Sequence, residues 1–156
     1  MKHKRLLTWI LAAVMVLLAL TCLVACVDDA EPVLKGTATV VVGEKTYSVN
    51  FEKAEFTSKN TAFNLLTYLA DNEKDFTFDC SFSGYGAFVN SICDAKPAES
   101  NQYVALFVSD EAYKDTSAYA LPNKTVNGVT YYYSGVGISA IKLADGLSVL
   151  FCLETF

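Results

Sequence analysis

Two glycine pairs are the parts of this sequence whose spacing could serve chemistry directly. They stand in Gly84-Tyr85-Gly86 and in Gly135-Val136-Gly137. Closely spaced glycines let the main chain approach a phosphate, as in the Gly-x-Gly-x-x-Gly loop that opens a dinucleotide-binding helix. The first pair has Val89 where a third glycine would stand, and the second is followed too soon by the Asp145-Gly146 turn. Both pairs therefore predict turns or close main-chain approaches at strand ends.

The sequence after residue 25 lacks the side chains on which most catalytic sites depend. His3, Arg5, Trp9 and both methionines all lie before that point. Without histidine there is no imidazole base and no imidazole metal ligand, and without arginine there is no bidentate clamp for phosphate. Ser-Lys, Cys-Lys and two-carboxylate mechanisms lack a recognisable spacing here. We therefore expect a binding protein rather than an enzyme, with no bound cofactor.

The acidic residues Asp71, Glu73 and Asp75 alternate like the opening of a calcium loop. However, Phe76 and Phe82 occupy the positions at which such a loop needs glycine and glutamate. We expect a solvated turn and no metal site.

Three cysteines follow residue 26, namely Cys80, Cys93 and Cys152, so at least one thiol is expected to be free. A tight hairpin would set Cys80 opposite Val89 and Cys93 opposite Phe76, too far apart for a disulfide. We expect these side chains to be buried as small apolar groups.

The first residues have the pattern of a bacterial export signal. A basic start precedes an uncharged run over residues 6–25. Its end, Leu23-Val24-Ala25-Cys26, resembles the lipobox of bacterial lipoproteins, where the chain is cut before a cysteine that receives a diacylglyceryl group. The resemblance implies a signal peptide at 1–25, a lipidated cysteine and tether at 26–36, and an extracytoplasmic domain anchored to the cell membrane. The alternative is an uncleaved helix, since such a run could span a bilayer of about 30 Å.

The expected cut leaves 9 lysines and 17 acidic residues, and 9 minus 17 gives a formal charge of −8. Such a charge argues against nucleic acid and anionic lipid headgroups as partners. The remaining chain is long enough for one domain with its own core.

The pattern over residues 37–156 predicts one α+β domain. Two β-branched runs joined at residues 43–45 indicate a hairpin, and apolar residues at helical spacing within residues 58–74 indicate a helix capped by Ser58 or Asn60. Further strands are expected at residues 75–82, 86–93, 103–109, 126–133 and 147–154. The first of these places Phe76, Phe78, Cys80 and Phe82 on one face, which we expect the fold to bury. The helix would cover one face of small antiparallel or mixed sheets.

Six motifs occur in a recognisable order: Phe76-x-Phe78, Gly86-x-Phe88-Val89-x-Ser91-Ile92, Tyr103, Gly135-Val136-Gly137, Asp145-Gly146 and Phe151. This order resembles the C-terminal β-domain of transcobalamin and intrinsic factor, and a bacterial family of unknown function often found on lipoproteins. The resemblance implies a β-grasp-like α+β fold and a surface that covers one face of cobalamin. The vitamin carriers hold the corrinoid against a helical barrel, which this chain lacks.

The resemblance also singles out the loop ends that would contact a ligand. The predicted ligand-binding residues are Tyr85, Phe88, Tyr132, Tyr133, Gly135, Val136 and Gly137. Flat aromatic faces beside bare main chain suit a planar or sugar-like partner. The alternative is that Tyr131 to Tyr133 form an ordinary strand with the middle ring on the other face.

Two functions follow from these patterns. The first is a membrane-tethered protein that binds a small ligand, with cobalamin or a related corrinoid as the candidate. The alternative is an interaction module that recognises a surface protein, a transporter or the cell wall through an exposed strand edge or through the 110–125 loop.

Overall fold

The computed structural model describes residues 31–156. The signal peptide expected at residues 1–25 and the lipidated Cys26 lie outside the described residues, so both stay predictions. In the described part of the chain, no helix is long and apolar enough to cross a membrane.

The chain begins its fold with the expected hairpin. Strand β1 (Thr37–Val42) pairs antiparallel with β2 (Lys45–Asn50), and Val42 lies opposite Lys45. Gly43 takes a φ of 59° in the two-residue turn, a conformation that glycine adopts without steric cost. Val40 and Val49 are almost fully buried, so this hairpin presents one apolar face to the core.

The described residues contain one α-helix, α2 (Ala62–Asn72). It begins later than expected, because Thr61 is its N-cap residue and donates its main-chain N–H to Asn64 Oδ1 at 2.8 Å. The predicted cap Asn60 instead accepts the Thr57 N–H at 2.7 Å, which closes the turn before the helix. Asn64 is the third residue of the helix, and its side chain fixes the first helical turn by this contact with Thr61.

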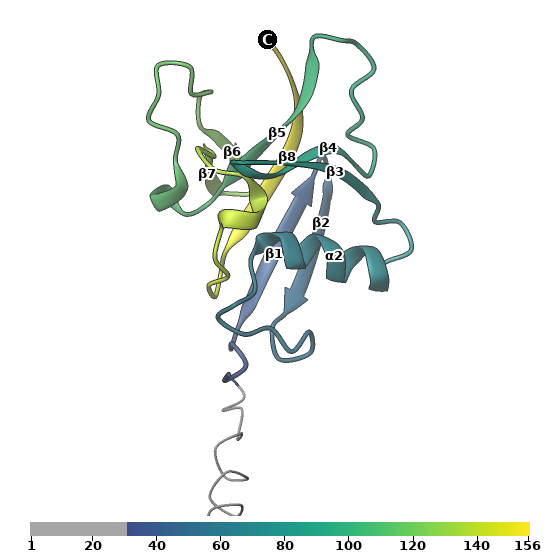
Figure 1. The fold of residues 1–156 in the computed structure, drawn as a ribbon, viewed down its shortest axis with the longest axis vertical. Helices are drawn as coiled ribbons and strands as arrows, with labels where there is room; N and C mark the ends of the chain where they lie inside the picture. The colour runs from purple at the N-terminus through teal and green to yellow at the C-terminus, as the bar shows by residue number, and fades with distance from the viewer. Residues whose placement is uncertain (1–30) are drawn as a thin grey trace, which may run out of the picture. The chain divides into compact units, whose positions relative to one another are not determined.

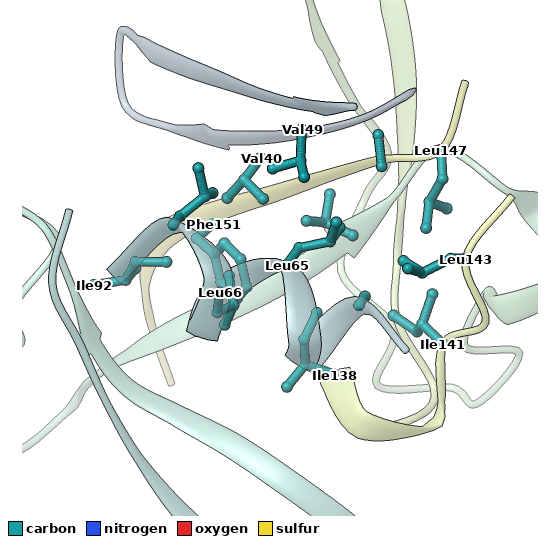
Figure 2. Packing of buried hydrophobic residues seen from close by; sticks show 14 of the residues in the cluster. Val40, Val49, Leu65, Leu66, Ile92, Ile138, Ile141, Leu143, Leu147 and Phe151 are labelled. Atoms are coloured by element: carbon teal, nitrogen blue, oxygen red, sulfur yellow. The ribbon is translucent and has the colours of Figure 1, made fainter. Parts of the chain in front are cut away.

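The helix buries one stripe against the sheet. Figure 1 shows α2 lying across β1 and β2, and Figure 2 shows Leu65 and Leu66 pointing toward Val40, Val49 and Phe151 of the strands. All five side chains are essentially inaccessible to solvent. This shared core accounts for the stability of a short helix that would be marginal alone.

The large sheet has six strands in the order β2-β1-β8-β5-β7-β6. Its remaining members are β5 (Gln102–Val108), β6 (Lys124–Val126), β7 (Val129–Tyr133) and β8 (Ser148–Thr155). Strands β1 and β8 run parallel and all other pairs run antiparallel, so the sheet is mixed. The described residues are thus mostly β, with one α-helix and a mixed sheet, which is compatible with the predicted α+β class, while the β-grasp likeness stays a prediction.

The prediction of one strand over residues 126–133 is wrong. The segment folds into a hairpin of β6 and β7, with Val126 opposite Val129. Asn127 and Gly128 form the turn with φ angles of 52° and 78°. An Asn-Gly pair favours this two-residue turn because both residues tolerate positive φ.

A second sheet contains two strands, β3 (Phe78–Ser83) and β4 (Gly86–Ile92), joined by the turn at Gly84-Tyr85. The first glycine motif is therefore a turn between strands, as predicted. The expected burial of the β3 apolar face fails at its end, where the Phe82 side chain is 70% exposed. Phe82 nevertheless lies on the same face as Phe78, since both rings pack edge-on against Phe63, but it stands at the end of the hairpin beyond the buried core.

The folded unit begins at Pro32 and therefore includes part of the segment expected to be a tether. The Leu34 N–H donates to the Phe56 carbonyl at 2.7 Å, and the Gly36 carbonyl accepts the Phe51 N–H at 3.0 Å. Residues 33–36 lie in the domain because their main-chain groups find partners there.

Candidate functional site

A cavity of about 220 Å³ lies where β4 passes beside β5 and the segment that follows β7. Its walls include Phe88, Tyr103, Leu106, Tyr133, Val136 and Gly137. Four of the seven predicted ligand residues therefore meet at one place, although they come from two segments about 45 residues apart in the sequence. None of the described residues that line the cavity is charged.

The two glycine motifs of the sequence build this cavity by lying against each other. A Cβ atom on Gly137 would stand 2.9 Å from the Ala87 carbonyl oxygen and 3.0 Å from that of Tyr85. A Cβ atom on Gly86 would stand 2.7 Å from Ser139 Oγ, which accepts the Ala87 N–H at 2.9 Å. The segment after β7 can press on β4 only because both positions lack a side chain. The predicted close approach is confirmed.

Three of the predicted ligand residues lie outside the lining. Tyr85 is 84% exposed in the β3–β4 turn. The Tyr132 ring lies under Lys114 Nζ at 5.3 Å, on the opposite face of β7 from its neighbours. Gly135 packs on the main chain of Asp115, where a Cβ atom would stand 3.2 Å from the Asp115 Cα. The alternation expected for an ordinary strand holds in β7, and it leaves Tyr133 on the cavity side.

Tyr103 is the aromatic residue of the cavity lining that the ligand prediction missed. Its ring stacks on Phe156 with centroids 5.4 Å apart. Burial, followed by the neighbouring Tyr133 hydroxyl, raises the pKa of Tyr103 to about 12, so this phenol is neutral near pH 7. In the sequence, Tyr103 stands out only as part of the family resemblance. It lies far along the chain from residues 85–88, so no local pattern links it to them.

The chemistry of the cavity follows from these walls. Aromatic and aliphatic side chains surround it, and the hydroxyl groups of Tyr103, Tyr133 and Ser134 are the polar side-chain groups among its described lining residues. Such a site favours a flat, uncharged group that can accept or donate one or two hydrogen bonds.

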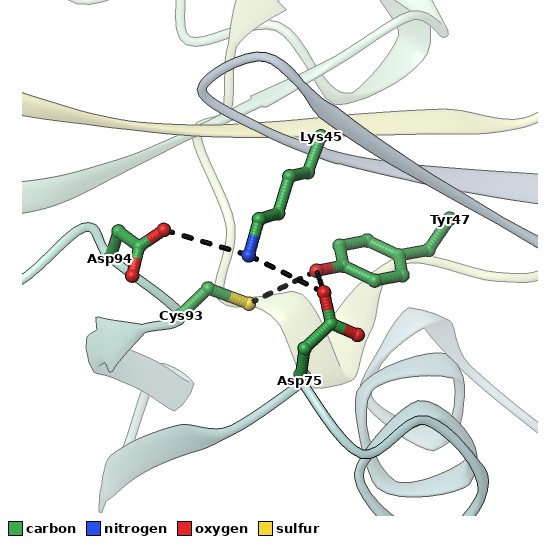
Figure 3. A network of polar contacts seen from close by, with 5 residues as sticks. All are labelled: Lys45, Tyr47, Asp75, Cys93 and Asp94. Atoms are coloured by element: carbon green, nitrogen blue, oxygen red, sulfur yellow. Dashed lines mark hydrogen bonds and ion pairs between the residues drawn. The ribbon is translucent and has the colours of Figure 1, made fainter.

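A polar network lies elsewhere, around Lys45 at the start of β2 (Figure 3). Lys45 Nζ lies 3.3 Å from Asp75 Oδ2 and 3.6 Å from an Asp94 carboxylate oxygen. The Tyr47 hydroxyl donates to Asp75 Oδ2 at 3.2 Å and lies 3.8 Å from Cys93 Sγ. The network joins three segments that are distant in the sequence, which is the role of a structural clamp.

The clamp shifts the titration of its charged members. The hydrogen bond from Lys45 lowers the pKa of Asp75, and the bond to Asp75 raises the pKa of Lys45. Burial raises the pKa of the Tyr47 phenol. All three shifts move the pKa of the group further from neutral pH.

The three cysteines of the described residues, Cys80, Cys93 and Cys152, are unpaired thiols. Burial raises the pKa of Cys152 to about 11 and also raises that of Cys80. A thiol with a raised pKa is a poor nucleophile at neutral pH. Within residues 31–156, no group of three or more His, Cys, Asp or Glu side chains is placed to hold a metal ion.

Comparison with known proteins gives little to add to this geometry. No protein family matches the sequence, and no curated protein matches it. One solved structure with a similar backbone is a protein of Ruminococcus gnavus ATCC 29149 that is provisionally described as metal-binding. It is 15% identical, the alignment covers 77% of this chain and 95% of that one, and the TM-score is 0.45. A likeness at this level carries no argument about function.

Proposed function

We propose that this chain is an extracytoplasmic binding protein, held to the membrane by a lipid on Cys26, that takes an uncharged ring into the cavity between β4 and β5. The observation that supports ligand binding is the cavity lining, in which Phe88, Tyr103 and Tyr133 converge with no charged neighbour among the described lining residues. Aromatic walls with hydroxyl tips bind flat groups and fix their orientation.

The size of the cavity narrows the ligand class. Pockets for drug-sized ligands enclose about 300–1,000 Å³, and an apolar cavity of about 150 Å³ suffices for benzene. The volume here, about 220 Å³, suits a single ring or one substituent of a larger molecule. A corrinoid would place only an edge group in the cavity, and its macrocycle would rest on Phe88 and Val136, which are 47% and 38% exposed at the rim.

The experiment is a calorimetric titration of the protein, purified from the bacterial envelope in detergent, with cobalamin, cobinamide, benzimidazole and indole. Saturable heat is expected for at least one of them. Phe88→Ala should abolish it, because Phe88 lines the cavity. Tyr85→Ala is the matched control, since this aromatic residue of the same hairpin lies outside the lining and is 84% exposed. Flat titrations with all four compounds would overturn the proposal.

The non-enzymatic role is part of this proposal. The residues that line the cavity offer hydroxyl groups but no carboxylate, lysine or thiol. A serine or tyrosine hydroxyl needs an adjacent base to become an effective nucleophile, and no such base is among the described lining residues.

A second function, recognition of a protein partner, is favoured by a separate observation. Strand β5, beside the cavity, pairs with β7 only at Phe107 and Val108, so most of that edge is unpaired among the described strands. The other surface expected for this function, the 110–125 loop, includes the short helix η1 (Glu111–Tyr113) and Tyr119, which is 91% exposed. The strand edge offers the more specific chemistry, because it presents main-chain donors and acceptors in a fixed direction.

A further inference from the structure

Strand β5 is paired along its whole length on one side and only at its end on the other. It pairs with β8 from Gln102 to Val108, but with β7 only at Phe107 and Val108. One more hydrogen bond, from the Ser134 N–H to the Leu106 carbonyl at 3.0 Å, closes that short contact. Among the described residues, no strand pairs with Gln102 to Ala105 on this side.

The register identifies the main-chain groups that face the open side. In antiparallel pairs, successive residues direct their N–H and C=O groups to alternate neighbours. The Leu106 carbonyl points to the β7 side, so the N–H and C=O of Val104 point the same way, together with the Leu106 N–H. Three ladder groups are therefore presented to whatever lies beside this edge, which is the feature that permits strand addition.

The open edge lies in a groove rather than on a bare surface. The cavity of about 220 Å³ adjoins Tyr103 to Leu106, and a hollow of about 350 Å³ continues from it toward Pro97 and Gln102. The two share Phe88, Val89, Tyr103 and Val104 as walls. From Gln102 to Leu106 a strand advances about 13 Å, enough for an extended segment of four or five residues.

We propose that this groove binds an extended peptide segment of a partner protein, which adds to β5 as a strand and inserts one aromatic or branched side chain into the cavity. The inference rests on the proposed function, because it assigns the partner class of the same cavity. The free main-chain groups of Val104 and Leu106 match an extended main chain, and the apolar cavity beside them supplies the side-chain selectivity of this binding mode.

The charge of the chain indicates what flanks the inserted residue. Residues 26–156 carry a formal charge of −8, from 9 lysines and 17 acidic residues. Two acidic residues neighbour the groove without lining it. Asp115 packs against Gly135, next to the lining residues Ser134 and Val136, and the Glu99 main-chain carbonyl accepts the Gln102 N–H at 3.1 Å. A segment with lysine or arginine beside its apolar residue is therefore the complementary partner, and salt should weaken its binding.

The test begins with selection of random eight-residue peptides displayed on phage, with the full protein in detergent as bait. The enriched peptides should share one aromatic or branched residue next to a basic one. Each is then synthesised and titrated as a free peptide. Replacement of its apolar residue by alanine should weaken binding at least tenfold, because the cavity loses its occupant.

Val104→Pro and Val104→Thr form the matched pair of variants. Proline removes the Val104 N–H, which points to the open side, so the ladder to β8 keeps its bonds. Threonine keeps that N–H and nearly the same side-chain volume. We expect Val104→Pro to weaken peptide binding by about fivefold or more, because one hydrogen bond contributes about 1 kcal/mol. Val104→Thr should change the peptide affinity by less than about twofold.

Amide exchange gives a readout that does not depend on affinity. In the free protein the Val104 and Leu106 amides should exchange quickly, whereas those of Ala105 and Phe107, which face β8, should be protected. The peptide should slow exchange at Val104 and Leu106.

The outcomes separate the inference from the proposed function. Equal peptide affinity of both Val104 variants, or unchanged exchange at Val104 and Leu106, would overturn strand addition. Saturable heat with a small ring compound but with no selected peptide would leave the proposed function standing and sink this inference. Sedimentation that shows a dimer lost in Val104→Pro would assign the edge to a second copy of this chain and would also overturn it.

Discussion

A Cβ atom on Gly137 would stand 2.9 Å from the carbonyl oxygen of Ala87, so these two residues touch main chain to main chain. They lie 50 positions apart. Gly137 ends the second glycine motif of the sequence, and Ala87 directly follows the first. The contact sets the floor of the cavity, because Ala87 and Gly137 are both among its walls. Disturbing this pair should therefore affect stability and binding together.

Gly137→Ala should destabilise the protein by about 1–3 kcal/mol and abolish binding in the cavity, because the new methyl group would push β4 and the following segment apart. Gly84→Ala is the matched control, since a Cβ atom there meets nothing within 4 Å. Its effect should stay within about 0.5 kcal/mol. Chemical denaturation checks both variants. An unchanged midpoint for Gly137→Ala would show that the close approach is not tight.

Leu66→Ala should lower the free energy of unfolding by about 2–5 kcal/mol, because Leu66 is fully buried between α2 and the sheet. Thr67→Ala, at the exposed neighbouring position, should cost less than about 0.5 kcal/mol. Thermal unfolding followed by circular dichroism measures the pair. Equal losses in the two variants would contradict the placement of the core.

Asp75→Asn should reduce the dependence of stability on acid pH. The pKa of Asp75 is lowered in the folded chain by Lys45, so its contribution is present above the ordinary carboxyl pKa, near 3.8, and is lost as the pH falls through the lowered value. Denaturation between pH 2 and pH 6 should therefore show a flatter profile for the variant. Asp71→Asn, which changes an exposed acidic residue outside this network, is the control and should leave the profile unchanged.

Cys152 should resist alkylation in the native protein. Burial raises its pKa to about 11, which exceeds the effect of nearby Lys124 in the opposite direction. Iodoacetamide at pH 8 should label Cys152 at least tenfold more slowly in buffer than in urea, because little thiolate is present. Mass spectrometry of the labelled peptides measures this ratio. Equal labelling rates in the two conditions would be inconsistent with a half-buried thiol whose pKa is raised.

Local patterns predicted the elements that depend on neighbours in the sequence. The hairpin over residues 37–50 follows from two β-branched runs around Gly43, and the helix follows from apolar residues at helical spacing. The helix cap and the β6–β7 turn were missed, although Thr61 and Asn127-Gly128 carry recognised local signals. Both signals lie in neighbouring residues, so the sequence carries this information locally.

Phe82 and Tyr103 show a different limit. The alternation in β3 places Phe82 on the Phe78 face, where it packs against Phe63, but the core does not extend over this end of the hairpin and the ring is 70% exposed. Tyr103 lines the cavity only because β5 lies beside β4. The segments that pack over each strand decide both exposures, and no local periodicity encodes which segments those are.

The sequence by itself determined the kind of chemistry that this domain can do. Its composition after residue 25 offers aromatic rings, hydroxyl groups and bare main chain, without imidazole or guanidinium. Only the tertiary structure decided where these groups meet. Gly137 reaches Ala87, and the β5 edge stays open beside Val104, because β7 turns away after two paired residues. Such contacts depend on which distant segments share a core, and the free energy that selects them belongs to the whole fold.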